Sequence, residues 1–367
     1  MDLEKPDRVP VMCQMSIGHM LLQTGFSPVE LWYSAEVFSE ALLHLREAYQ
    51  FDGILISLHG HSPDWENNIK RIEKKGNEEI VYWKNGDKTE FPKDDLPRHY
   101  PCQIPHHPSI SDFEPEKISE NLDYIPVSQG LNFYLDPDHK YDIFRTIHDR
   151  AGAEYSIHGE VTSPFDYFLN LFGFKQALMD LLQDPLKCKE ILQRFTDGVK
   201  RLAAEMSDQK IDAIKISSPY AGQGFISPEF YLQFVLPYES QIAKAARSQG
   251  IHVYLHTCGA IGDRLEMMVE SSISGLECLD PPPLGNVELA DAKKRVGHKV
   301  FIKGNIDPVN TLLYGNERAV RDDAEYRMRL GKPGGGYILS TACSIAPHTK
   351  KENIKILAQV TEEKGYY

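Results

Sequence analysis

The chain has 367 residues, of which 41% are hydrophobic and 25% charged, enough to bury one large core or two modest ones. No apolar run approaches the roughly 18 uninterrupted residues of a membrane span, and residues 1–6 lack the apolar region of a signal peptide, so we expect a cytoplasmic protein that does not enter a membrane. The formal net charge of -13 at pH 7 argues against binding to nucleic acid, and six scattered cysteines indicate reduced thiols rather than a disulfide framework.

The first part of the chain predicts two strands and a helix. A short strand is expected at 8–13, a helix at 28–45 and a buried strand at 51–57. The second strand runs into Leu58-His59-Gly60-His61, which places two histidines at a strand end. We expect His59 and His61 to bind substrate by hydrogen bonds; loop packing and metal binding are the alternatives.

Residues 62–150 interrupt the alternation of strands and helices. Two β-rich runs, 80–83 and 89–91, flank Asn85-Gly86-Asp87, a strong signal for a hairpin. A Pro- and His-rich stretch follows at 96–108. Because this region lacks the apolar periodicity of a separate domain, we expect an insertion in a single domain of residues 1–367, acting as a cap or as an oligomer contact such as that of a homodimer.

The alternation resumes after residue 150. Helices are expected at 165–182, 185–199 and 228–249, and strands at 153–161, 211–217, 253–256, 273–279, 299–303 and 337–341. The eight β segments with helices in most intervals, and no glycine-rich dinucleotide motif after the first strand, favour an α/β fold of the (β/α)8 TIM-barrel type with an N-terminal extension and the hairpin-containing insertion.

Three soft ligands are predicted to meet at strand ends. The strand at 253–256 ends in His256, and Cys258 lies two residues further on the same face. Cys343 follows the last strand. A Cys2His set with an open fourth position is typical of catalytic zinc; the alternative is a core histidine with two small buried thiols. Chemistry in such barrels collects at the C-terminal strand ends, which favours zinc.

Other polar residues near strand ends are weaker candidates. Glu277, Cys278 and Asp307 are candidates for a fourth zinc ligand or for a contact to a ligand; for Glu277 and Asp307 the alternative is a loop cap. Asn305 is expected to bind substrate. Four side chains are expected to move protons in catalysis: His158, Glu160, Tyr220 and Asp307.

Several of these segments resemble one known family. The motifs at 256–259, 303–308 and 335–340, with similarity extending back through 163–165 and 226–231, resemble the uroporphyrinogen decarboxylase superfamily over most of residues 150–360. Within it, the His-x-Cys…Cys set is the mark of cobamide-dependent methyltransferases, whose resemblance implies that His256, Cys258 and Cys343 bind zinc. The Arg-Gln-Ala-Gly-Arg segment with which the decarboxylase grips carboxylates is replaced here by residues 14–19, which contain no arginine.

The resemblance implies that the protein catalyses one of two alternative half-reactions of a zinc-dependent methyl transfer. Zinc could activate an O-methyl donor, such as a methoxylated aromatic, for attack by Co(I) of a corrinoid, or it could present a thiol of the coenzyme M type to methyl-Co(III). Two thiolate ligands favour the second half, whereas the His- and aromatic-rich insertion and the Asp280-Pro281-Pro282-Pro283 turn favour the first, which we adopt.

The corrinoid itself is expected on another protein. No Asp-x-His-x-x-Gly loop for corrinoid binding occurs in the sequence, so a separate corrinoid protein is the expected partner. A non-enzymatic zinc- or corrinoid-binding chaperone on a barrel scaffold is the alternative from another functional class.

Overall fold

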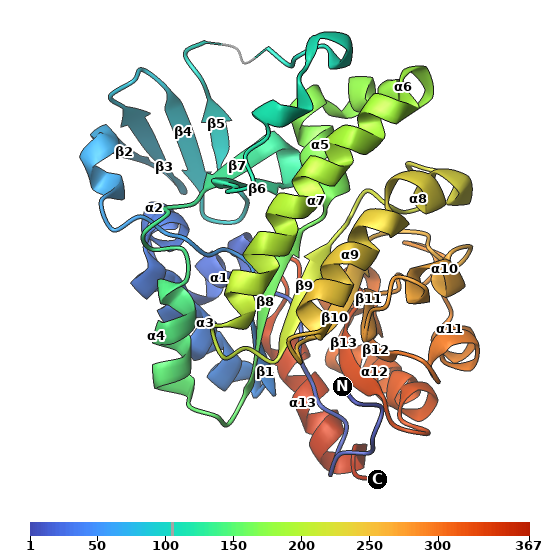
Figure 1. Cartoon of the computed structure of the whole chain (residues 1–367). Coiled ribbons are helices and arrows are strands. Elements are labelled where there is room, and N and C mark those ends of the chain that lie inside the picture. The colour runs from blue at the N-terminus through green and yellow to red at the C-terminus, as the bar shows by residue number, and fades with distance from the viewer. Residues whose placement is uncertain (104–105) are drawn as a thin grey trace.

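A curled parallel sheet forms the centre of the molecule (Figure 1). The computed structural model describes residues 1–103 and 106–367; the two others belong to the Pro- and His-rich stretch and lie outside the described residues. The seven strands lie in the order β1 (Gly53–Ile56), β8 (Ser156–Thr162), β9 (Ala213–Ser217), β10 (His252–Thr257), β11 (Gly275–Cys278), β12 (Phe301–Ile306) and β13 (Tyr337–Thr341).

The gap between β13 and β1 is filled by the N-terminal segment. Val11 forms a parallel bridge with Leu339, and the amide of Asp52 donates to the carbonyl of Val11 at 2.8 Å. The expected strand at 8–13 is therefore wrong as a strand, although the segment occupies the eighth position of the barrel. Pro10 has no amide hydrogen to give to a ladder, which accounts for isolated bridges in place of continuous pairing. The TIM-barrel-like fold is confirmed.

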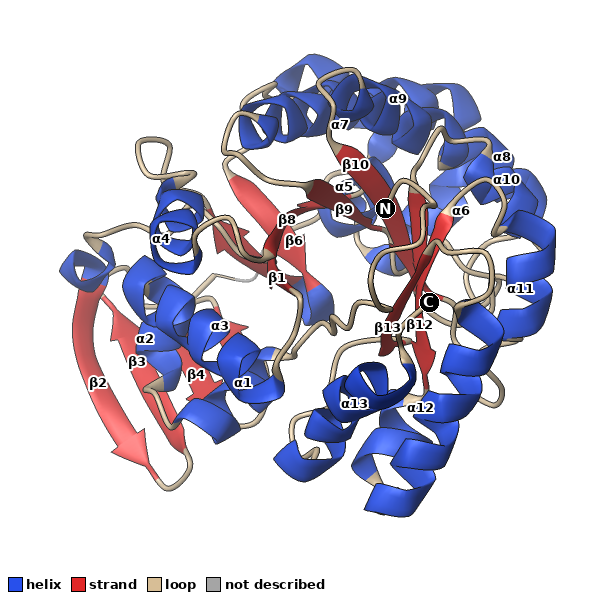
Figure 2. Cartoon of the chain, turned by 90° about the horizontal axis from the view of Figure 1, so that it is seen from below, coloured by secondary structure: helices blue, strands red, loops and turns tan. Residues whose placement is uncertain are grey.

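Helices surround the sheet (Figure 2). They are α1 (Ile17–Thr24), α2 (Pro28–Tyr33), α3 (Ala35–Tyr49), α4 (Asp142–Ala151), α5 (Pro164–Phe172), α6 (Phe174–Gln183), α7 (Pro185–Ser207), α8 (Pro228–Phe234), α9 (Leu236–Arg247), α10 (Leu265–Val269), α11 (Leu289–Val296), α12 (Glu317–Gly331) and α13 (Lys351–Lys364). Short 3₁₀ turns lie at η1 (Trp65–Asn68), η2 (Ile110–Asp112), η3 (Pro115–Lys117) and η4 (Ser128–Gly130), and a π-helical turn at η5 (Pro308–Leu313).

Each of the three expected helices at 28–45, 165–182 and 228–249 is two helices. Ser34 ends α2 and, in an extended conformation, caps α3 through its side chain. Gly173, with φ of +76°, separates α5 from α6, and Val235 separates α8 from α9. Apolar periodicity continues through these breaks, so it does not reveal them. No helix in the described part of the chain is long and apolar enough to cross a membrane.

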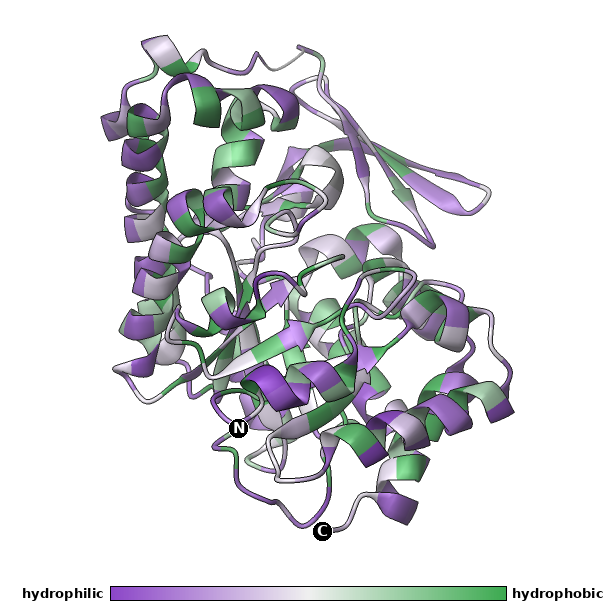
Figure 3. Ribbon diagram, turned by 90° about the vertical axis from the view of Figure 1, so that its right-hand side faces the viewer, coloured by the Kyte–Doolittle hydropathy of each residue, from purple (hydrophilic) through white to green (hydrophobic). Residues whose placement is uncertain are grey.

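The region 62–150, which we expect to be an insertion, contains two small antiparallel sheets. The first is formed by β2 (Ile69–Lys75), β3 (Glu78–Trp83), β4 (Lys88–Pro92) and β5 (Arg98–Tyr100), and the second by β6 (Tyr124–Val127) and β7 (Leu131–Tyr134). The expected hairpin is confirmed as β3–β4, with Gly86 at φ of +98° in its turn. The larger sheet projects from the body with many hydrophilic residues (Figure 3).

The lower interior of the barrel is plugged by apolar side chains. A small cluster separate from the main core contains Met12, Leu55, Ala213, Tyr254, Phe301 and Ile338. These side chains come from strands all around the barrel, so the barrel is a packed core at this level. The polar groups described next occupy the strand ends above it.

Candidate active site

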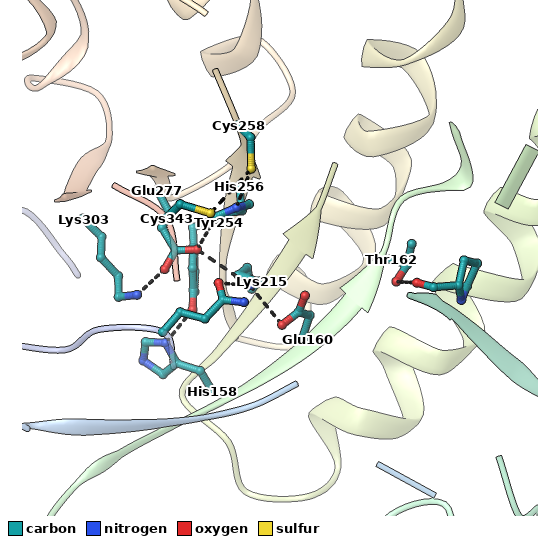
Figure 4. A network of polar contacts seen from close by, with 12 residues as sticks. His158, Glu160, Thr162, Lys215, Tyr254, His256, Cys258, Glu277, Lys303 and Cys343 are labelled. Carbon is teal, nitrogen blue, oxygen red and sulfur yellow. Dashed lines mark hydrogen bonds and ion pairs between the residues drawn. The ribbon is translucent and has the colours of Figure 1, made fainter. Parts of the chain in front are cut away.

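Three predicted ligands lie together at the strand ends (Figure 4). His256 is the fifth residue of β10 and is buried, while Cys258 and Cys343 follow β10 and β13 and are partly exposed. The Nε2 atom of His256 lies 3.3 Å from Sγ of Cys258, which lies 3.8 Å from Sγ of Cys343. Residues far apart in sequence thus meet at one rim of the barrel.

The spacing of these atoms fits zinc. Two sulfur ligands at about 2.3 Å from a tetrahedral zinc ion lie about 3.8 Å apart, and a sulfur and a nitrogen ligand about 3.6 Å apart. The distances between Cys258 and Cys343 and between Cys258 and His256 are close to these values. The donor set of imidazole and thiols is also the one that zinc prefers.

A further thiol approaches the same place. The ligand atoms of His256, Cys258 and Cys278 all lie within 4.8 Å of one another. Two overlapping sets of possible metal ligands therefore share His256 and Cys258. One set adds Cys343, and the other adds Cys278. Hydrogen bonds with Cys258 and Cys278 hold the pKa of the Cys343 thiol well below its ordinary value, which favours its thiolate form.

A buried network of charges supports His256 from below. Oε2 of Glu277 lies 2.7 Å from Nδ1 of His256, and its other oxygen pairs with Lys303. Nζ of Lys215 lies 3.9 Å from Glu277, 3.0 Å from Glu160 and 2.7 Å from Oε1 of Gln14.

These cations decide the charge state of Glu277. Burial alone would raise the pKa of Glu277, but Lys303 and Lys215 outweigh burial and hold that pKa well below its usual range. The ionised carboxylate accepts a hydrogen bond from Nδ1 of His256, so Nε2 is the ring nitrogen that faces the thiol of Cys258. Both oxygens of Glu277, a candidate fourth ligand, are thus engaged with side chains around the site.

The three predicted ligands open onto a cavity of about 1310 Å³. Its walls come from the β6–β7 hairpin, α5 and the loops after the strands. Aromatic side chains line it, namely Trp32, Tyr124, Tyr134, Phe174, Tyr220 and Phe225. Its acidic side chains are Asp123, Glu160 and Asp166, and none of the described residues that line it is an arginine or a lysine.

Comparison with known proteins identifies the family of this chain. The family model "Uroporphyrinogen decarboxylase (URO-D)" matches residues 122–364. The chain belongs to the uroporphyrinogen decarboxylase family. The resemblance seen in the strand-end motifs is thereby confirmed. The match begins at residue 122, ahead of residue 150, from which those motifs extend.

Similar members of the family include enzymes of two kinds. The methylcobamide:CoM methyltransferase MtaA of Methanosarcina barkeri is 26% identical over 226 residues, covering 62% of this chain and 63% of that protein. The uroporphyrinogen decarboxylase of Nostoc punctiforme is 25% identical over 217 residues, covering 58% and 56%. The chain thus spans about three-fifths of the length of these curated relatives.

Solved structures show the same fold. A methyltransferase from Methanosarcina mazei superposes with a TM-score of 0.73 at 18% identity, covering 98% of this chain and 95% of that one. A putative vitamin-B12 independent methionine synthase from Listeria monocytogenes superposes with a TM-score of 0.51 at 12% identity, covering 97% and 96%.

Two of the residues expected to move protons line the cavity of this family member. Glu160 projects from β8, and Tyr220 packs edge-on against Phe174 and Phe225. His158 lies deeper in the barrel and outside the lining, with Nδ1 3.0 Å from the hydroxyl of Tyr254 (Figure 4). Burial lowers the pKa of His158 to about 3, which keeps its ring neutral.

Four other candidates also lie outside the cavity lining. Asp307 caps η5 by accepting from the amides of Val309 and Asn310. Asn305 donates to the carbonyl of Leu279. The remaining two are histidines: His59 stacks on Tyr141, and His61 packs against Phe38 and Phe133. These contacts hold loops and helices around the rim.

Three residues of the site were not among the sequence candidates. Lys215 and Lys303 are fully buried, and each interrupts an apolar strand, a pattern that signals a paired buried charge. Asp166 lines the cavity at the start of α5, and burial raises its pKa to about 8. Asp166 directly follows the Ser163-Pro164-Phe165 motif, which was the available signal.

Proposed function

We propose that this protein is a zinc-dependent methyltransferase that transfers the methyl group of a small, uncharged O-methyl compound, such as a methoxylated aromatic, to Co(I) of a corrinoid carried by a separate protein. The observation that carries the proposal is a zinc-type donor set opening onto an aromatic-lined cavity with no arginine or lysine among its described residues.

The charge of the cavity selects among substrates of the family. A tetrapyrrole acid with many carboxylates, or a thiol that carries a sulfonate such as coenzyme M, needs fixed cations. Gln14 to Ile17, in the segment where the decarboxylase carries its arginines, lines the cavity and contributes none. Aromatic walls instead suit a planar, neutral substrate through stacking and apolar contact.

The ligand roles follow from the contacts. His256, Cys258 and Cys343 would hold the zinc ion, and Glu277 orients the imidazole. Zinc bound there would supply Lewis acidity to the heteroatom that carries the methyl group. Lys303 and Lys215 keep Glu277 ionised, so its carboxylate accepts the hydrogen bond from Nδ1 that turns the other ring nitrogen toward the thiols.

A proton must reach the leaving oxygen. As the methyl carbon bonds to cobalt, the oxygen keeps the electron pair of the broken C–O bond and takes up a proton. Asp166 is suited to this step because a carboxyl group whose pKa is about 8 is protonated at neutral pH. Tyr220 and Glu160 share the cavity wall and are the other candidate donors.

The assay for this function follows cobalt directly. The protein, loaded with zinc, is mixed with a reduced corrinoid protein and a panel of methoxylated aromatics, and loss of the Co(I) absorbance is recorded. We expect Co(I) loss only with enzyme and donor together, and none after chelation of zinc although the fold persists. Co(I) that persists with every O-methyl donor would contradict the proposal.

Thiol methylation is the second candidate. The similarity to the methylcobamide:CoM methyltransferase MtaA and the thiol-rich donor set favour it. Methylation of a thiol by methylcobalamin, with no reaction of any O-methyl donor, would place the protein in that half of the reaction.

A further inference from the structure

Two side chains of the cavity lining are held by the buried ammonium group of Lys215 (Figure 4). Lys215 on β9 stands directly opposite Glu160 on β8, and its Nζ lies 3.0 Å from Oε2 of Glu160. The same Nζ lies 2.7 Å from Oε1 of Gln14, in the N-terminal segment that completes the barrel, and 3.9 Å from Oε2 of Glu277. Three oxygens of the protein thus surround the ammonium group, which matches its three N–H donors.

The ammonium group decides which atoms of Gln14 and Glu160 remain for a ligand. Because an ammonium group only donates hydrogen bonds, the amide of Gln14 must turn its oxygen toward Lys215 and its NH2 group, Nε2, away from it. Oε2 of Glu160 is buried against Lys215, which leaves Oε1 as the second oxygen of that carboxylate. In the described part of the chain, neither Nε2 of Gln14 nor Oε1 of Glu160 has a hydrogen-bond partner. We call these two atoms the Gln14–Glu160 pair.

One amide donor next to one carboxylate acceptor matches a hydroxyl group. A hydroxyl gives its own hydrogen to Oε1 of Glu160 and accepts a hydrogen bond from Nε2 of Gln14. The other common groups fail on one side. An ammonium group offers no acceptor to the amide, an ether oxygen offers no hydrogen to the carboxylate, and a carboxylate of the ligand would face the like charge of Glu160.

We propose that the Gln14–Glu160 pair is a subsite for a free hydroxyl group of the substrate, so that the protein prefers methoxylated phenols to aromatic compounds whose oxygens are all methylated. The inference rests on the proposed function, from which it takes the methoxylated aromatic. Lys215 is the positioning residue of this subsite. It contacts Glu160 and Glu277 at once, and so connects the hydroxyl subsite to the carboxylate that orients His256. The substrate is held at its hydroxyl in the same cavity onto which the predicted zinc ligands open.

Binding to the metal-free protein tests the subsite without turnover. Calorimetry in the presence of chelator measures Kd for 2-, 3- and 4-methoxyphenol and for the three matching dimethoxybenzenes, in which a methyl group replaces the hydroxyl hydrogen. We expect at least one methoxyphenol to bind about 10- to 100-fold more tightly than its dimethoxy counterpart, because the latter desolvates the carboxylate without offering it a donor. Since the chelator removes zinc, this preference cannot come from a phenol oxygen bound to the metal.

Exchanging the two side chains tests their separate roles. In Glu160→Gln the new amide must also turn its oxygen toward Lys215, so the pair presents two donors and the preference for a hydroxyl should be lost. Adding Gln14→Glu restores one carboxylate and one amide around Lys215. Because a hydroxyl hydrogen can rotate toward either side, the preference should then return. Glu205→Gln is the matched control. It also removes a carboxylate that faces a lysine, Lys140 at 3.9 Å, but Glu205 lies in α7 outside the cavity lining, and the preference should stay at the wild-type value.

The wild-type measurement decides the proposal even if a variant does not fold. Equal affinity for methoxyphenols and dimethoxybenzenes, no measurable binding of either, or a preference that survives in folded Glu160→Gln would each overturn the subsite. The methyl-transfer assay fails or succeeds separately. Co(I) loss with methoxyphenols and dimethoxybenzenes alike would agree with the proposed function and contradict the subsite. A hydroxyl preference in binding without Co(I) loss from any donor would keep the subsite and contradict the proposed function.

Discussion

Replacing Glu277 with glutamine tests the buried charge network beneath the site. The carboxylate is 2% exposed and contacts two lysines whose side chains are fully buried. At an effective dielectric constant of about 20, the 3.9 Å pair with Lys215 alone is worth about 4 kcal/mol before desolvation. Glu277→Gln leaves Lys303 without its anionic partner, and breaking a buried pair of this kind costs about 3–5 kcal/mol.

The loss should be visible in thermal unfolding. With an unfolding entropy of about 2.1 cal/mol/K per residue, a chain of 367 residues loses about 4–6 °C in Tm for that cost. Melts are recorded with chelator, so that metal affinity does not contribute. Glu266→Gln is the control, because it breaks the ion pair of Glu266 with Arg295. The Glu266 carboxylate is 58% exposed, and an ion pair of this kind contributes about 0–1 kcal/mol to stability.

The pH dependence gives the sign of the effect. Since the folded pKa of Glu277 is below its unfolded value of about 4.3, its stabilisation is complete above that pH and is lost as pH falls toward the folded pKa. The difference in Tm between wild type and Glu277→Gln should therefore narrow below about pH 4. Zinc affinity should also fall about 10- to 100-fold, since the imidazole loses its carboxylate partner. A Glu277→Gln protein that is as stable as the wild type and binds zinc as tightly would refute this account.

Three further outcomes are expected. Cys258→Ala and Cys343→Ala should each lose stoichiometric zinc by metal analysis while keeping their circular dichroism, and full zinc in both would exclude the ligand set. The free energy of unfolding of the wild type should fall between about pH 4 and pH 8, and Asp166→Asn should make this fall smaller. The reason is that a carboxyl group whose folded pKa is raised stabilises the protein below its unfolded pKa and loses this contribution as the pH rises through about 8. The same dependence of the unfolding free energy on pH in the variant, measured by chemical denaturation, would contradict this expectation. The purified protein should release no CO2 from a tetrapyrrole acid, since Gln14 to Ile17 brings no cation to the cavity, and decarboxylation would show that carboxylates are held elsewhere.

The order of strands and the positions of the predicted zinc ligands were within reach of the sequence. Apolar runs ending in polar residues located all seven strands of the barrel sheet, and the short spacing between His256 and Cys258 is a local property of one chain segment. The Asn-Gly turn likewise predicted β3–β4 because its chemistry is contained in adjacent residues. The β-rich run that ends just before Cys343 predicted a third ligand in the same way, and the family motifs implied the same residue.

Other features were decided only by the tertiary structure. Strand ends carry many polar residues, and sequence could not tell that Asp307 caps a helical turn whereas Asp166 faces the cavity, since both follow a strand. The approach of Cys278 depends on a left-handed backbone conformation that residue type alone disfavours. The ion pair of Lys303 with Glu277 joins neighbouring strands, and its strength comes from burial, which exists only once the barrel has closed around it.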